Sequence, residues 1–199
     1  DLQTLRLFYR FSRFEFALSL LATLGVIWVG AIDAIVVAVV LALLHFVHLT
    51  ARPRAEVLGE VEGLPGFHSV ARHPTAQTHR GLLLFRFNAP LVFFNAAYFK
   101  QQAQAAIDAA GPDLKWFVLD ALPVTQVDVT GYCAWEDLAK SLRAKGVELV
   151  LAGRMTELIE RRKASGLGEI QIVSRHFPTL AQAVDNFHQG VRVLEIQEL

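Results

Sequence analysis

Cysteine is nearly absent from this sequence, and charge of one sign never accumulates. Cys133 is the only cysteine, which excludes an intrachain disulfide and a paired-cysteine metal or redox site. It falls within a predicted helix, where we expect an ordinary buried thiol. Lysine and arginine together number 19, as do aspartate and glutamate, and no long run of either sign occurs. The chain therefore lacks the basic surface that binds nucleic-acid phosphates, and we expect no nucleic-acid partner.

The sequence also lacks an initiating methionine and the features of a signal peptide. It begins at Asp1, and its first residues do not show a basic segment, an apolar segment and a small-residue cleavage site in that order. We therefore expect the sequence to be a fragment of a longer protein.

A long apolar stretch stands near the beginning of the chain. Residues 16–49 contain a single carboxylate, Asp33, and no lysine or arginine. The stretch is longer than one membrane crossing of about 20 residues and shorter than two complete ones. Gly30 predicts a helix stop and Asp33 the N-cap of a second helix, so we predict a transmembrane hairpin with helices over residues 14–30 and 34–49. Each helix would measure about 24 Å, short of a hydrocarbon core of about 30 Å.

Basic residues lie at both ends of this hairpin and not at its turn. Arg6, Arg10 and Arg13 precede it, and Arg52 and Arg54 follow it. Both ends are therefore predicted to face the cytoplasm, together with the rest of the chain. The alternative is a buried helical hairpin in a soluble all-helical domain, which is disfavoured because neither helix has a polar face.

After a linker at residues 50–54, strand and helix patterns alternate. We predict strands over residues 57–61, 82–87, 91–94, 116–120 and 148–152, with a further strand near residues 170–173. We predict helices over residues 95–110, 130–144, 155–164 and 179–190. The segment between the first two strands is rich in Gly, Pro and His, and predicts an exposed connection. The continuous apolar runs are typical of buried parallel strands, so the sequence predicts an α/β domain.

Several motifs, in this order, resemble the C-terminal end of SulP anion permeases. The apolar hairpin with Arg52–Arg54 resembles that family's last two membrane segments. Residues 82–96 resemble the strand, proline and strand that open its STAS domain. Residues 116–120 followed by 127–131 are similar to the second STAS signature, a buried strand that ends in an acid before a D-x-[ST]-G turn. Residues 177–179 also match.

This resemblance covers nearly the whole chain and implies a SulP-type secondary transporter for sulfate, bicarbonate or a related anion. It divides the chain into a membrane hairpin at residues 1–54 and a cytoplasmic STAS domain, a mixed sheet flanked by helices, at residues 55–199. The family's substrate site lies mainly in earlier helices, so this part would serve regulation and assembly. The implied location is the plasma membrane or inner membrane.

Asp128, Thr130 and Gly131 form the predicted STAS signature turn. In free-standing STAS proteins that act as anti-sigma-factor antagonists, the residue after the aspartate is a phosphorylatable serine, whereas this chain has Val129. Thr130 retains a hydroxyl, and we expect it to cap the following helix. Phosphorylation of Thr130 is the less favoured alternative. Binding of a small anion or nucleotide at this turn is a weaker hypothesis, because no Gly-rich loop or lysine accompanies it.

The other polar residues predict neither catalysis nor metal binding. Asp120 and Asp128 stand near strand ends without a base or nucleophile beside them, so we expect no enzyme activity and no cofactor. The histidines after the linker lack metal-ligand spacing; they are His68, His73, His79, His176 and His188. The basic run at residues 161–163 is expected to complement a helix dipole, with lipid contact as the alternative.

We expect the domain to act through its surface. Leu91, Phe93 and Phe94 are the candidate interaction surface, because exposed apolar patches mark contact sites. The expected partners are the rest of the permease membrane domain, the lipid bilayer, a second copy in a homodimer and a cytosolic protein. The alternative function is a membrane-tethered STAS module that binds a partner without transporting anything, and an enzyme is a third and weaker one.

Overall fold

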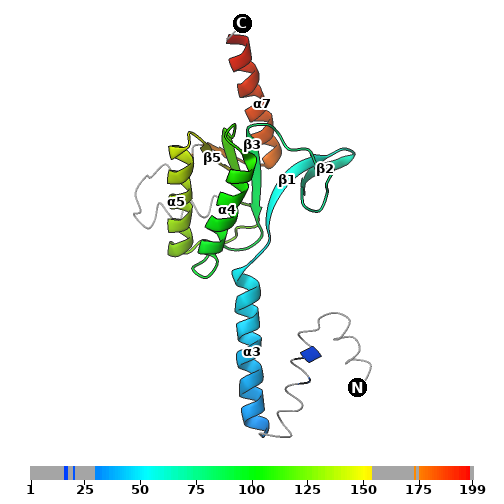
Figure 1. The fold of residues 1–199 in the computed structure, drawn as a ribbon, viewed down its shortest axis with the longest axis vertical. Coiled ribbons are helices and arrows are strands. Elements are labelled where there is room, and N and C mark those ends of the chain that lie inside the picture. Colours follow the sequence, from blue (N-terminus) through cyan, green and yellow to red (C-terminus); the bar gives the residue numbers. More distant parts are fainter. Residues whose placement is uncertain (1–15, 18–19, 21–29, 154–172, 174, 198–199) are drawn as a thin grey trace. The chain divides into compact units, whose positions relative to one another are not determined.

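The computed structural model describes residues 16, 17, 20, 30–153, 173 and 175–197, and for residues 191–197 it describes the backbone alone (Figure 1). The chain divides into two compact units, Asp1–Ala51 and Arg52–Leu199. Helix α3, Ala31–Ala51, belongs to the first unit. The second unit contains, in order, β1 Ala55–Val61, β2 Leu64–Ser69, β3 Leu82–Phe87, α4 Ala96–Ala110, β4 Trp116–Asp120, α5 Val129–Ala144, β5 Glu148–Ala152, β6 Arg175–Phe177 and α7 Leu180–Gln197.

Helix α3 is apolar on all sides and almost uncovered. Its 21 residues have a mean hydropathy of 2.4 over the most apolar window, and only 6% of that window is buried. At 1.5 Å per residue the helix is about 31 Å long, which matches the hydrocarbon thickness of a bilayer. Its large apolar side chains that are exposed are Ile32, Ile35, Val36, Val37, Val39, Val40, Leu43, Leu44, Phe46, Val47 and Leu49. By length and composition, α3 can cross a membrane.

The start of α3 corrects the predicted hairpin. The helix begins at Ala31, and the N–H of Ala34 already donates to the carbonyl of Gly30 at 3.1 Å. Asp33 therefore lies inside the first turn, where its charge suits the helix dipole, and is not the N-cap. Because it begins before Asp33 and ends at Ala51, the helix is longer than predicted. Nearly all of the other predicted helix, residues 14–30, lies outside the described residues.

The second unit is built on a mixed six-stranded sheet in the order β2-β1-β3-β4-β5-β6. Strands β3, β4, β5 and β6 are parallel, whereas β1 is antiparallel to both of its neighbours. Arg86, Asp120 and Ala152 are aligned across β3, β4 and β5, so the carboxyl ends of these strands share one edge of the sheet. The predicted α/β fold with a mixed sheet is confirmed.

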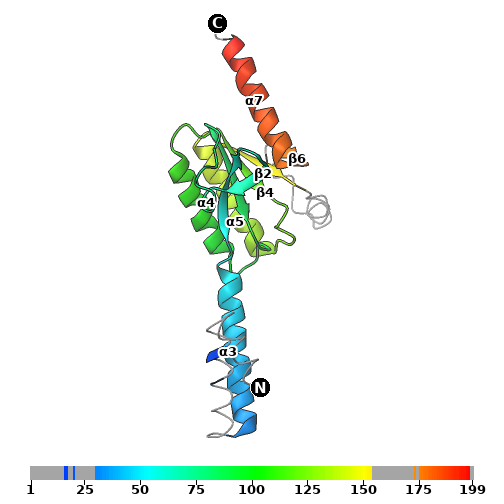
Figure 2. The ribbon, with the colours of Figure 1, turned by 90° about the vertical axis from the view of Figure 1, so that its right-hand side faces the viewer.

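Helices cover both faces of the sheet (Figures 1 and 2). Alternate residues of each strand point to opposite faces, so β3 supplies Phe85 to one core and Leu84 to the other. Helices α4 and α5 pack on the first face, with Phe87, Phe99, Phe117, Trp135 and Leu142 in that core. Helix α7 packs on the second, with Leu58, Trp116, Val118, Val184 and Phe187. The central strands are buried on both faces of the sheet, which explains why their sequences are continuously apolar.

The central elements were predicted well and the peripheral strands less so. The strands predicted at residues 57–61, 82–87, 116–120 and 148–152 are confirmed, and so are the helices over residues 95–110 and 130–144. The predicted strand at residues 91–94 is wrong, because Leu91 forms only an isolated bridge with Val127. The predicted exposed connection contains strand β2, which was missed because Pro65 and Gly66 interrupt its sequence. Such residues are tolerated in an edge strand.

The C-terminal part of the second unit contains one short strand and one long helix among the described residues. The last strand among the described residues is Arg175–Phe177, which was not predicted, and residues 170–172 of the strand predicted near residues 170–173 lie outside the described residues. Thr179 caps the final helix as predicted, since its Oγ1 accepts from the N–H of Gln182 at 3.2 Å. That helix runs to Gln197, further than predicted. The predicted helix at residues 155–164 and the basic run within it lie outside the described residues.

Candidate functional site

Two loops meet at the edge of the sheet where the parallel strands end. Residues 88–95 follow β3 and residues 121–128 follow β4. The N–H of Leu91 donates to the carbonyl of Gln126 at 2.8 Å. The chain also enters the second unit at this edge, because the N–H of Asn88 donates to the carbonyl of Arg54 at 2.9 Å. We call this surface, made of residues 52–54, 88–95 and 121–130, the linker edge.

The carboxylate of Asp128 joins the two loops to helix α5. Its Oδ1 accepts from the N–H of Gly131 at 2.7 Å, and its Oδ2 accepts from the N–H of Phe93, also at 2.7 Å. Asp128 is thereby the N-cap of α5, with an extended backbone conformation (φ −89°, ψ −179°). A charged acceptor makes both bonds strong and complements the positive helix N-terminus. One side chain therefore fixes the start of α5 and the loop before α4.

Gly131 is required by lack of space. A Cβ at this position would overlap the carbonyl oxygen of Leu91 and lie 2.9 Å from its carbonyl carbon. Glycine thus lets the first turn of α5 approach the backbone of the loop after β3. The sequence located this residue through the signature turn, and the structure supplies the reason for its identity.

Asn95 is a structural residue of the site that sequence reasoning missed. It is 0% exposed. Its Oδ1 accepts from the N–H of Val92 at 2.9 Å, and its Nδ2 donates to the carbonyl of Pro90 at 2.9 Å. These bonds satisfy the backbone of the loop locally, which explains why the segment is not a strand. Its position directly before α4 was the available signal.

Thr130 does not cap α5, contrary to the prediction. It is the second residue of the helix and is exposed, while Asp128 occupies the N-cap position. A carboxylate just outside the helix reaches the free N–H groups, and a hydroxyl already inside the first turn is not needed for this purpose. Phosphorylation of Thr130 stays a prediction.

The predicted interaction surface changes in composition. Leu91 is 1% exposed and belongs to the core, so it cannot form part of a contact surface. Phe93 is 69% exposed, and its ring centroid lies 5.1 Å from that of the half-buried Phe94. Leu122 (66% exposed) and Val129 (75% exposed) lie at the same edge and were not predicted. The available signal for Val129 was an apolar residue directly after the acid of the predicted turn.

The other acid at this edge is also engaged in structural contacts. Asp120 is buried, and its Oδ2 accepts from Nε of Arg86 at 2.6 Å. Its Oδ1 accepts from the N–H of Leu122 at 3.1 Å. Asp120 and Asp128 thus hold the two loops of the linker edge in place through internal hydrogen bonds.

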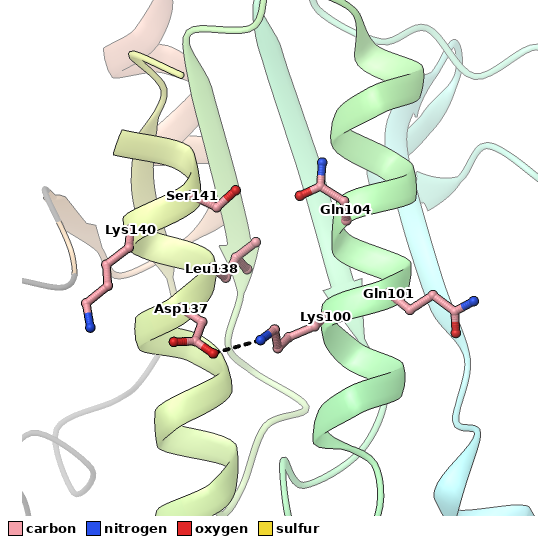
Figure 3. A pocket seen from close by; sticks show the side chains of 7 residues that line it. All are labelled: Lys100, Gln101, Gln104, Asp137, Leu138, Lys140 and Ser141. Atoms are coloured by element: carbon pink, nitrogen blue, oxygen red, sulfur yellow. Dashed lines mark hydrogen bonds and ion pairs between the residues drawn. The ribbon is translucent and has the colours of Figure 1, made fainter. Parts of the chain in front are cut away.

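A groove of about 500 Å³ lies between α4 and α5, and none of the linker edge residues lines it (Figure 3). Nζ of Lys100 donates across it to Oδ2 of Asp137 at 2.7 Å. That hydrogen bond and the charge of Lys100 lower the pKa of Asp137. The groove is lined by Lys100, Gln101, Gln104, Asp137, Leu138, Lys140 and Ser141. Lys140, the other charged residue of the lining, pairs with Glu136 one turn earlier on α5, its Nζ lying 2.8 Å from Oε1.

Two histidines far apart in the sequence meet between the sheet and α7. Nε2 of His188 and Nδ1 of His79 share a hydrogen bond of 3.1 Å, and Nε2 of His79 lies 3.9 Å from Oε1 of Glu60. Burial lowers the pKa of His79, and the nearby Glu60 partly opposes this effect. Within the described part of the chain, no group of three or more metal-binding side chains occurs. Cys133 is exposed, contrary to the prediction of a buried thiol.

Comparison with known proteins extends the similarity beyond the site. The family model of the STAS domain matches residues 73–183. The protein named "Probable sulfate transporter Rv1739c" of Mycobacterium tuberculosis is 33% identical over 189 residues, covering 95% of this chain and 34% of that protein. "High affinity sulfate transporter 2" of Stylosanthes hamata is 27% identical over 195 residues, covering 94% of this chain and 30% of that protein. This chain therefore spans about a third of the length of these relatives.

Solved structures share the fold over most of the chain. The murine Solute Carrier 26 family member A9 anion transporter, in its inward-facing state, superimposes with a TM-score of 0.79 at 22% identity. The similarity covers 93% of this chain and 30% of that one. These relatives are transporters and STAS domains, not enzymes. The chain belongs to the STAS domain family and is homologous to the C-terminal part of the SulP and solute carrier 26 sulfate transporters.

Proposed function

We propose that this chain is the C-terminal part of a SulP-type secondary anion transporter, in which the STAS domain serves regulation and assembly. One observation supports this most strongly. The similarity to proteins named as sulfate transporters covers 95% of the chain, so it extends from the STAS domain into the apolar N-terminal unit. A STAS domain joined to such a unit suits a membrane protein better than a free regulator.

In this proposal α3 is the last membrane-spanning helix of the transporter. Its length of about 31 Å is sufficient for one crossing. Arg52 and Arg54 follow it, and by the positive-inside tendency they support a cytoplasmic position for its C-terminal end. Residues 1–54 then belong to the membrane domain, with a preceding helix over residues 14–30. Residues 55–199 form a cytoplasmic domain beneath the plasma or inner membrane.

The role of the STAS domain is contact with partners. Asp120, Asp128 and Asn95 are engaged in internal hydrogen bonds. Exposed apolar groups, in contrast, gather at the linker edge, with Phe93 and Val129 the most exposed. Exposed apolar groups are typical of contact surfaces. The partners proposed for the domain as a whole are the remainder of the membrane domain, a second copy in a homodimer and a cytosolic protein.

Anion uptake by the full-length protein tests the proposal. Purified protein in proteoliposomes is expected to take up sulfate, bicarbonate or a dicarboxylate above the level of protein-free vesicles. Protein truncated before Arg52 is expected to lose uptake or dimer formation, which would locate regulation and assembly in the STAS domain. A full-length protein that moves none of these anions would contradict transport and favour a membrane-tethered binding module.

A further inference from the structure

Two residues with exposed apolar side chains, Phe93 and Val129, are linked through Asp128 at the linker edge. Phe93 and Val129 are 69% and 75% exposed. The backbone N–H of Phe93 donates to Asp128, the residue directly before Val129, so the same carboxylate fixes the positions of both. Hydrogen bonds to Asp128 therefore fix the backbone that carries these two exposed apolar side chains.

The linker edge carries almost no negative charge toward its surroundings. Residues 88–99 contain no charged side chain, and residues 121–135 contain only Asp128. Both oxygens of Asp128 accept backbone N–H groups. Asp120 is buried and paired with Arg86.

The exposed charges at this edge are positive. Arg52 and Arg54 are exposed, and the carbonyl of Arg54 accepts from the N–H of Asn88 within the edge itself. The neighbouring acid, Glu56, lies 2.7 Å from Arg72, which compensates its charge. The edge thus combines apolar side chains with two arginines.

The linker tethers this edge to the end of α3. Ala51 ends the helix, and Ala55 begins β1 opposite Phe87 of β3. A fully extended chain over these four steps spans at most about 14 Å. If α3 crosses the bilayer as proposed above, the linker edge lies close to the headgroups on the cytoplasmic side.

We propose that the linker edge binds the anionic surface of the bilayer. Phe93 and Val129 insert among the lipid headgroups, and Arg52 and Arg54 pair with lipid phosphates. Aromatic and aliphatic side chains flanked by arginine are suited to this interface, because the apolar groups leave water while the cations meet negative lipid. This inference rests on the proposed membrane crossing by α3 and does not depend on which anion is transported.

Fluorescence quenching at the two ends of one helix tests the proposal. The full-length protein is placed in nanodiscs of phosphatidylcholine with or without phosphatidylglycerol, in a background free of other cysteines, with Cys133→Ser included. A fluorophore is attached at Val129→Cys, at the N-terminal end of α5. The matched control is Ala144→Cys, exposed at the C-terminal end of the same helix. Brominated lipid and aqueous iodide serve as the two quenchers.

The expected result is severalfold stronger quenching by brominated lipid at Val129 than at Ala144, with the reverse order for iodide. The difference should shrink without phosphatidylglycerol and in the double variant Arg52→Gln, Arg54→Gln. Equal iodide quenching at both sites would overturn the proposal. So would protection of Val129 from both quenchers, which would indicate that protein covers the edge. Anion uptake measured on the same protein tests transport separately, since lipid contact without uptake would contradict only that function.

Discussion

Helix α3 and strand β4 are both built almost entirely from apolar residues, yet only the strand is covered by protein. All five residues of Trp116–Asp120 are buried between α4, α5 and α7. In α3 only Ala34 is buried. Water would oppose the exposure of so much apolar surface, whereas lipid would not. This contrast is the one expected if α3 lies in lipid, as proposed, while the second unit buries its apolar residues in a core of its own.

The largest effect is expected from a charge in the middle of α3. Val40→Asp should oppose membrane insertion by about 3 to 4 kcal/mol, because a carboxylate is poorly solvated at the bilayer centre. The measurement is the fraction of protein that remains in membranes after alkaline extraction. Val40→Leu, the apolar control, should behave as the unaltered chain. Equal retention of the Asp variant would contradict a lipid environment for α3.

A single methyl group added inside the second unit should be nearly as destabilising. Gly131→Ala should lower the free energy of unfolding of the STAS unit by about 3 kcal/mol, because the new Cβ collides with the backbone of Leu91. Gly190→Ala is the matched control, since a Cβ at that helical position would meet no described atom beyond its own helix backbone within 4 Å. It should be neutral or stabilising by up to about 1 kcal/mol. Denaturant unfolding that shows no difference between the two would contradict the close approach.

The next prediction distinguishes the contributions of Asp128 and Thr130 to stability. Asp128→Ala should cost about 2 kcal/mol, because it removes the N-cap of α5 and leaves the N–H of Phe93 without its acceptor. Thr130→Val should change the stability by at most about 0.5 kcal/mol, as expected for an exposed position. Thermal and denaturant unfolding measure both. A Thr130 variant as unstable as the Asp128 variant would restore the threonine as the cap.

The smallest effect concerns the contact between α7 and the sheet. Because the pKa of His79 in the folded protein lies below its usual value of 6.5, the unfolded chain binds more protons as the pH falls through that range. The stabilising contribution of neutral His79 is therefore present above a pH of about 6.5 and is lost on acidification. The unfolding temperature should fall between roughly pH 7 and pH 5, and fall less in His79→Gln. An equal fall in both proteins would show that other groups control the change.

The centre of the fold was predictable because its signals are local. The strands at residues 82–87, 116–120 and 148–152 are continuous apolar runs, and α4 and α5 show helical spacing of their apolar residues. Residues 91–94 show an equally apolar run but form a loop, because groups outside the run accept three of its backbone N–H groups. The acceptors are the carbonyl of Gln126, the side chain of Asn95 and the carboxylate of Asp128. The apolar run does not show which groups will accept its hydrogen bonds.

The site was located by its motif, but the roles of its residues were not. A carboxylate and a hydroxyl can both cap a helix, and the choice between Asp128 and Thr130 depended on a difference of two residues in where α5 begins. The exposure of Phe93 and the burial of Leu91 depend on which parts of the chain cover them. The contact between His79 and His188 joins residues 109 positions apart, which no local pattern encodes.

Hydrogen exchange on the chain in lipid nanodiscs tests the central claim most directly, namely that a lipid-solvated helix is joined to a STAS domain with its own core. The backbone amides of Ala31–Ala51 should exchange slowly in lipid, and those of Trp116–Asp120 should exchange slowly whether lipid or detergent surrounds the protein. Exchange of the α3 amides in nanodiscs at the rate of an unstructured peptide, with the β4 amides still protected, would contradict the account.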